Sequence, residues 1–198
     1  MSSIYTNLNY PDNQRGWVLV VGLVILVMLT ILSMALMKTT RLEEKMAGAT
    51  RDMNLSFQAA ESALRAAETF IELQTVESFF DTTDMLYGIY NQTDDEPEDL
   101  FAIDWDVTNS AIAGRLEGDP LGLDPLELEG VALPPRYMIK KIDDEDDTAP
   151  TVFRVTGRGT GGTNNRATLL RSHYAKAFDA DSAGPVGRLS WEQLFPSQ

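Results

Sequence analysis

The apolar positions of the chain follow three patterns in turn, and the first is an uninterrupted run. Residues 17–37 carry no charged side chain, and 13 of these 21 residues are Leu, Ile or Val. At a rise of about 1.5 Å per residue, a helix of this length spans roughly 30 Å, the thickness of the hydrocarbon core of a bilayer. The run therefore predicts one membrane-spanning helix.

Beyond residue 37 the apolar positions recur every three or four residues, as they do on one face of a helix. Prominent members of this stripe are Leu42, Met46, Met53, Phe57, Leu64 and Ile71. Because no proline occurs in residues 12–96, we expect a single helix from near Trp17 to near Glu77. A helix of about 60 residues cannot be wholly buried in a domain of this size, so part of it must pack in the membrane or against other subunits.

The third pattern is a set of short strand-like runs near the C-terminus. They lie at residues 136–142, 151–159 and 166–178, and turn-forming segments separate them. We predict an α+β fold in which a long N-terminal membrane-spanning α-helix packs on a small antiparallel β-sheet. The predicted divisions are residues 1–16 as a leader, 17–37 as the transmembrane half of the helix, 38–80 as its amphipathic half, and 81–198 as an acidic loop region and the sheet.

The tail "GPVGRLSWEQLFPSQ" predicts a further short helix. Ser190 and Gln193 have the spacing of a capping box, and Pro196 would end the helix. We expect its apolar face, which includes Trp191, to pack back on the domain.

Charge is distributed unevenly along the chain. The total is −14, but residues 81–147 alone carry −15, with 19 acidic and 4 basic side chains. This balance argues against nucleic acid as a partner. The densest acidic cluster, "DDEDD", offers Asp143, Asp144, Asp146 and Asp147 as weak calcium candidates. It lacks the spacing and the glycine of an EF-hand loop, and such runs are more often solvated, so we expect no metal site.

The chain lacks the parts of a nucleophilic enzyme. His173 is the only histidine, cysteine is absent, and there is no G-x-S-x-G motif. The string "GRGTGG" at residues 157–162 is followed by neither a P-loop lysine nor a helix pattern, and we interpret it as a turn. We therefore predict no enzymatic activity, no catalytic residue and no cofactor, and a structural role for His173.

Several strings resemble a known family. A short polar leader ending in "QRG", an apolar helix directly after the glycine and a continuous amphipathic extension resemble a type IV prepilin. The strings "TTRLEEKMAG", "RDMNLSFQAAESALRAAE", "FRVTGRGTGGTNN" and "GRLSWEQLF" resemble the PilX family of minor pilins. The resemblance covers the helix and the last fifty residues, and it is weak across residues 81–130.

The resemblance implies specific processing of the N-terminus. Prepilin peptidase cuts after the leader glycine and methylates the new amine, which makes Gly16 the last leader residue and Trp17 the mature N-terminus. Typical pilins have a glutamate at the fifth mature residue that pairs with a neighbour's amine, whereas here that position is Val21. The tip pseudopilin of type II secretion, the K component, also lacks this acid. The predicted assembly face of the helix thus consists of Val21 and the stripe from Leu42 to Ile71.

The implied function is that of a structural minor pilin which helps to start assembly of a type IV pilus and caps its tip, with roles in adhesion or twitching motility. The implied partners are other minor pilins, the major pilin, prepilin peptidase and the inner membrane. Before assembly the chain would cross the inner membrane once with a cytoplasmic N-terminus. After assembly it would lie at the pilus tip, at the cell surface.

Other interpretations remain open from the sequence. Cleavage of a secretory signal after Ala35 would release a soluble protein, although the apolar run is longer than a usual signal. Lys38, Arg41 and Lys45 follow the span and argue for the opposite orientation. The string "LEEKMA" fits either a charged partner site or a solvated helix face. The chain could also be a type II secretion pseudopilin or a membrane-anchored periplasmic binding module, such as an adhesin or calcium sensor.

Overall fold

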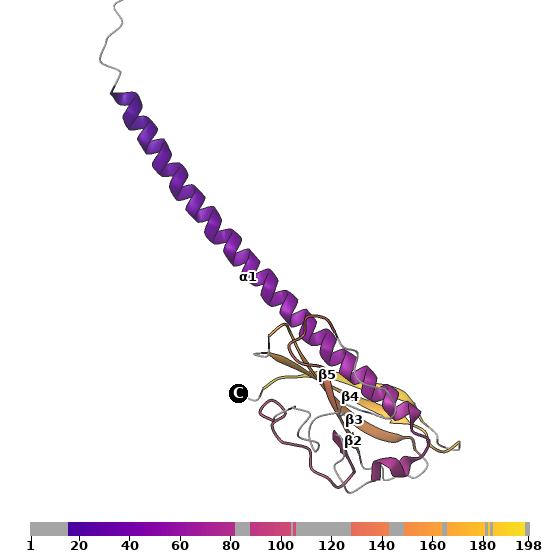
Figure 1. Cartoon of the computed structure of the whole chain (residues 1–198). Coiled ribbons are helices and arrows are strands. Elements are labelled where there is room, and N and C mark those ends of the chain that lie inside the picture. Colours follow the sequence, from indigo (N-terminus) through magenta and orange to yellow (C-terminus); the bar gives the residue numbers. More distant parts are fainter. Residues whose placement is uncertain are drawn as a thin grey trace, which may run out of the picture. The chain divides into compact units, whose positions relative to one another are not determined.

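The computed structural model describes residues 16–81, 88–103, 105, 128–142, 149–163, 166–180, 182 and 184–196. The chain divides into two compact units, Met1–Gly48 and Ala49–Gln198, and each is described by itself. Helix α1, Trp17–Leu73, begins in the first unit and ends in the second (Figure 1). The long helix and the α+β class predicted from the sequence are both confirmed.

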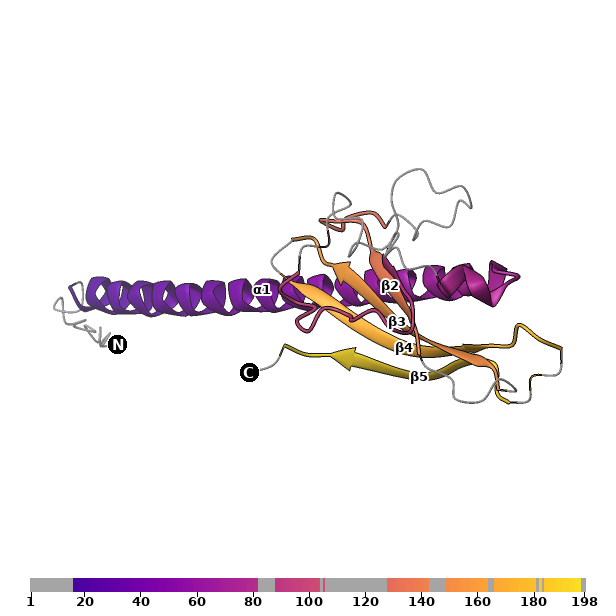
Figure 2. The same ribbon diagram turned by 90° about the horizontal axis from the view of Figure 1, so that it is seen from below.

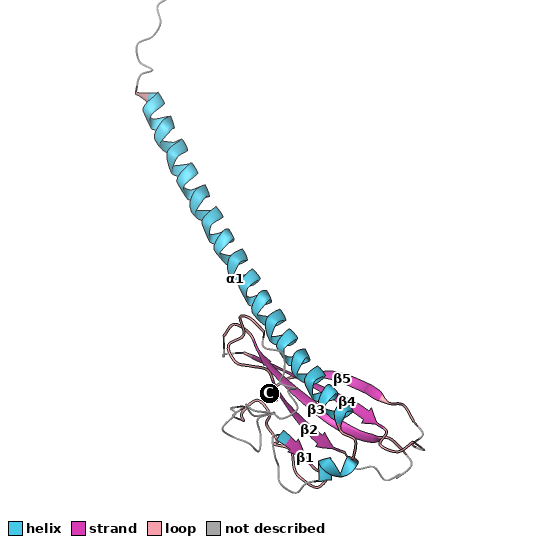
Figure 3. Ribbon diagram, turned by 45° about the vertical axis from the view of Figure 1, so that its right-hand side comes forward, coloured by secondary structure: helices cyan, strands magenta, loops and turns pink. Residues whose placement is uncertain are grey.

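The second unit holds a five-stranded sheet with the strand order β1-β2-β3-β4-β5 (Figure 3). The strands are β1 Ile89–Tyr90, β2 Arg136–Lys141, β3 Thr151–Thr160, β4 Ala167–Lys176 and β5 Gly187–Leu194. Strands β2 to β5 are antiparallel neighbours, whereas the short β1 runs parallel to β2. The sheet is therefore mixed, because one two-residue strand departs from the antiparallel pattern.

One face of α1 in the second unit packs on this sheet. Its buried residues lie either one or three positions apart and are mostly small: Ser56, Ala59, Ala60, Ala63, Leu64, Ala67, Phe70 and Ile71. They share a core cluster with strand residues such as Phe153, Val155 and Leu170. Small side chains on a helix let its backbone come close to a neighbouring element, so the backbone of α1 lies close to the sheet.

The "GRGTGG" string is largely strand, so its interpretation as a turn was wrong. Gly157 and Gly159 belong to β3 and face α1. A Cβ at Gly157 would lie 2.7 Å from the carbonyl oxygen of Ala60, and one at Gly159 would lie under 3.0 Å from backbone atoms of Ser56 and Ala60. The glycines are thus present because the helix backbone occupies the space that a side chain needs.

The other face of the sheet has its own apolar cluster. Tyr90 of β1, together with Leu100 and Trp105 of the segment after it, packs with Met138 of β2 and Leu169 of β4. The Trp105 indole Nε1 donates a hydrogen bond to the Leu100 carbonyl at 2.9 Å, which satisfies the one polar atom that this ring buries. Both faces of the central strands are therefore covered.

Helix α1 ends at Leu73, before the predicted end near Glu77. The Lys176 ammonium on β4 donates hydrogen bonds to the carbonyls of Ile71 at 2.7 Å and Glu72 at 2.6 Å, and also to that of Gln74. A cation that binds the free carbonyls of a helix C-terminus stabilises that end. A short 3₁₀-helix, η2 Glu77–Asp81, follows after three residues.

The C-terminal tail is a strand, so the predicted helix there was wrong. Residues 187–194 form β5, which lies beside β4 (Figure 2). The pairing of the two strands places Ser190 opposite His173 and Trp191 opposite Ser172. A helix of so few residues is marginal on its own, whereas the open edge of β4 offers a full row of backbone hydrogen bonds. The edge of the sheet therefore decides the conformation of the tail.

Candidate assembly surface

The part of α1 in the first unit exposes apolar side chains on all sides. Trp17 and Val21 are both exposed, as is every large apolar residue of the uncharged run. The Thr30 hydroxyl donates to the Leu26 carbonyl at 2.7 Å and the Ser33 hydroxyl to that of Leu29 at 2.8 Å, so these polar groups are satisfied within the helix. Among the described residues, this is the one helix long and apolar enough to cross a membrane.

The predicted stripe divides into an exposed and a buried part. Leu42, Met46, Met53 and Phe57 are exposed, with Met53 at 59% and Phe57 at 36%. Leu64 and Ile71 are fully buried, and both belong to the core between α1 and the sheet. The protein's own sheet therefore covers Leu64 and Ile71. Only the part of the stripe up to Phe57 is available for contact with another subunit.

An aromatic pair extends this open surface onto β5. The rings of Phe57 and Trp191 meet edge to face with centroids 5.7 Å apart. Trp191 remains 42% exposed, and Leu189, two residues earlier in β5, is exposed as well. The sequence pattern gave no sign of this patch, because it depends on a strand that the tail was not predicted to form.

Ion pairs fix β5 against α1. The Arg188 guanidinium donates two hydrogen bonds to the Glu68 carboxylate, each at 2.8 Å, and one to Glu61 at 3.0 Å. The hydrogen bond to Glu68 is the main reason that the pKa of Arg188 is raised, so the side chain stays charged. The Tyr174 hydroxyl donates to Glu72 one helical turn further along. These contacts set the position of Trp191 relative to the helix.

His173 lies on the opposite face of the sheet, among charged residues. Its Nδ1 and the Ser190 hydroxyl are 2.8 Å apart, across the β4–β5 pair. Burial lowers the pKa of His173, and the nearby guanidinium groups of Arg154 and Arg171 lower it further. The carboxylate of Glu96 binds the same two arginines, at 3.2 Å and 3.8 Å. This network joins the segment after β1 to the sheet beside His173.

The remaining predicted site residues lie either directly before α1 or outside the described residues. Gly16 is a turn residue immediately before α1. The calcium candidates Asp143, Asp144, Asp146 and Asp147 lie outside the described residues. In the part of the chain that is described, no three His, Cys, Asp or Glu side chains are grouped so that they could hold a metal ion.

Residues 15–65 match the family model described as PilX N-terminal. This N-terminal segment, about a quarter of the chain, is similar to the PilX family. The PilX match includes the uncharged run and the exposed stripe, and it ends before the buried Ile71 and the sheet. At the family level the match supports a minor pilin related to the type IV pilus. PilX proteins are structural pilins, and the family implies membrane anchoring and interaction with other pilus components. No curated protein and no solved structure matches the chain.

Proposed function

We propose that this PilX-type chain helps to start assembly of a type IV pilus and remains at its tip. The observation that carries the proposal is the exposure of large apolar side chains on α1, Leu42 and Met46 in the first unit and Met53 and Phe57 in the second. Within the second unit, Phe57 also contacts the exposed Trp191 of β5. Apolar side chains at helical spacing, outside both core clusters of the described residues, fit helix packing against other pilins. Other minor pilins and the major pilin are the proposed partners.

Val21 supports a position at the end of the filament. A carboxylate inside a membrane helix is costly unless a partner is supplied, and typical pilins keep one at this position to meet a neighbour's amine. Val21 is uncharged and lies in the exposed apolar run. A subunit without that acid gains little from docking beneath another subunit, yet its stripe can still support subunits added below it.

Before assembly, we propose that the chain crosses the inner membrane once with its N-terminus in the cytoplasm, where prepilin peptidase removes residues 1–16 and methylates Trp17. After assembly the C-terminal unit is displayed at the cell surface. In that position it could serve adhesion or twitching motility.

Sheared pili from a strain with an epitope tag after residue 196 test the tip position. We expect rare label at filament ends and loss of pili when the gene is deleted, with recovery from a plasmid copy as the control. Label spread evenly along filaments would contradict the tip position. Intact pili together with loss of secreted enzymes would instead assign the chain to a type II secretion system.

A further inference from the structure

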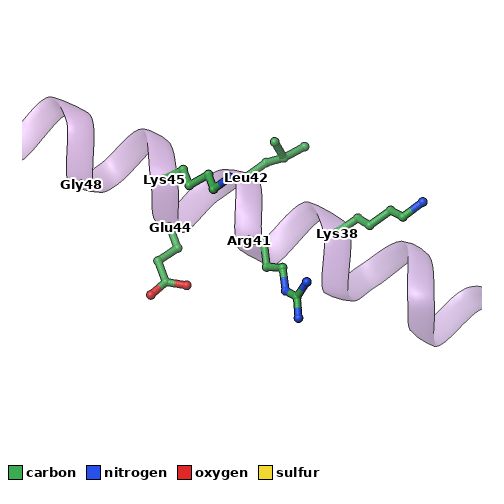
Figure 4. A pocket seen from close by; sticks show the side chains of 6 residues that line it. All are labelled: Lys38, Arg41, Leu42, Glu44, Lys45 and Gly48. Carbon is green, nitrogen blue, oxygen red and sulfur yellow. The ribbon is translucent and has the colours of Figure 1, made fainter.

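Just beyond the uncharged run, α1 presents three cations on one side. Lys38, Arg41 and Lys45 are separated by three and four residues, so they share one helix face, here called the basic face. All three are exposed, and within the described residues none of them forms an ion pair. With Leu42, Glu44 and Gly48 they line a shallow groove on the helix surface (Figure 4).

The three side chains lean toward the membrane-spanning part of the helix. Side chains of an α-helix point toward its N-terminus, and Figure 4 shows Lys38, Arg41 and Lys45 extending that way. Lys45 lies about 10 Å along the axis from Lys38, so its long side chain brings its charge closer to the other two. The positive charge is therefore concentrated near the end of the uncharged run.

An apolar face continues from the basic face in the direction of the bilayer. Val27, Ile31 and Met34 precede Lys38 at intervals of four, three and four residues, and all are exposed. Of the two nearby acids, Glu44 flanks Arg41, whereas Glu43 lies on another side of the helix. One side of α1 thus offers an apolar surface followed by cations.

We propose that this side of α1 binds an anionic phospholipid, with an acyl chain along Val27, Ile31 and Met34 and the phosphate against Lys38 and Arg41. Two observations select this occupant: the charge of the basic face is opposite to that of the headgroup, and the face continues a segment that fits the bilayer. A guanidinium binds phosphate oxygens through two parallel hydrogen bonds, so Arg41 supplies geometry as well as charge.

The lipid holds the subunit at a fixed depth in the membrane. Its contacts must be lost when the helix is withdrawn into a filament, so they oppose premature release. The inference rests on the membrane anchoring in the proposed function and is independent of the tip position, because lipid binding is measured on the single subunit.

Native mass spectrometry of the full chain in detergent micelles tests the proposal. The micelles contain equal amounts of palmitoyl-oleoyl phosphatidylglycerol and the zwitterionic phosphatidylcholine. We expect phosphatidylglycerol to be retained preferentially, and the triple variant Lys38→Gln, Arg41→Gln, Lys45→Gln to lose this preference. A juxtamembrane cation contributes roughly a fivefold change in binding, so the loss should reach at least about tenfold.

The matched control removes three cations from the second unit, in the variant Arg51→Gln, Arg65→Gln, Arg166→Gln. Equal retention of the two lipids by the unmodified chain would overturn the proposal, as would the same loss in control and test variants. Unchanged lipid retention combined with loss of pili in the test variant would identify a partner helix as the occupant, and would also overturn it.

Discussion

Gly159 sets the distance between α1 and β3 more directly than any apolar contact does. Its missing side chain leaves room for backbone atoms of Ser56 and Ala60, which cannot be displaced without moving the helix. The hydroxyls of Ser56 and Thr168 approach to 2.7 Å beside it, so the same close approach also brings a buried polar pair together. One residue type at one position thus determines both the packing and a hydrogen bond.

Replacement Gly159→Ala should therefore destabilise the fold. The added methyl group overlaps helix backbone, and we expect the free energy of unfolding to fall by at least about 2 kcal/mol. Thermal unfolding followed by circular dichroism in detergent measures this. Gly48→Ala is the matched control: nothing lies within 4 Å of its Cβ, and alanine favours a helix by about 0.5–1 kcal/mol. Equal melting temperatures for the two variants would contradict the close approach.

His173 should make stability depend on pH. Burial and the charges of Arg154 and Arg171 lower its pKa in the folded state, so below about pH 6.5, its ordinary value, the unfolded chain binds the proton more readily. Stability contributed by the neutral ring is thus present above pH 6.5 and is lost as the pH falls through the lowered folded-state pKa.

Denaturant unfolding at pH 7.5 and pH 5.5 measures this contribution. We expect the unmodified chain to lose more stability between the two values than His173→Gln, in which residue 173 carries no titrating group. Parallel losses in the two proteins would show that other groups control the pH dependence.

Among the elements, the helix and three of the strands could be predicted because their patterns are local. The three-and-four repeat extends well past the membrane run, and the runs at 136–142, 151–159 and 166–178 lie close to the observed β2, β3 and β4. What could not be predicted depends on distant residues. The tail is a strand because β4 has an edge to pair with, and "GRGTGG" is a strand because α1, about one hundred residues earlier, covers it.

The assembly face illustrates the same limit. The repeat cannot distinguish Met53 from Leu64, since both have the spacing of one helix face. In the structure Leu64 is fully buried under the sheet, whereas Met53 remains exposed. Which apolar residues of an amphipathic helix meet the protein's own domain is decided by where the sheet ends, and no local pattern encodes that position.

This division predicts different effects of two charge substitutions. Leu64→Asp would place an unpaired carboxylate in the core and should cost several kcal/mol of folding free energy. Met53→Asp should change folding by less than about 0.5 kcal/mol, because the site is exposed, while still reducing pilus number. Thermal unfolding and counts of pili per cell separate the two effects. A folded Met53→Asp protein that supports normal pili would show that Met53 makes no assembly contact.

At the scale of the whole molecule, the proposed cut before Trp17 would decide which residues the mature protein keeps. If processing follows the PilX pattern, N-terminal sequencing and intact mass of protein from native membranes should show methylated Trp17 as the first residue. Gly16→Val should block the cut, because prepilin peptidase recognises the glycine, and leave the leader attached. A mature chain beginning at Leu36 would instead establish a secreted, soluble protein.

The pairing of α1 with strands made much later has a consequence for synthesis. Ser56 meets Thr168, 112 residues further along the chain, and Glu68 meets Ser172 after 104. At roughly 5–20 residues per second, the ribosome needs about 5–20 s to make that intervening length. During this interval Leu64 and Ile71 have no folded sheet to cover them. The length of the acidic middle region therefore contributes to the time for which the buried face of a newly made helix stays uncovered. Lengthening that region would extend the period in which this apolar face is exposed to aggregation.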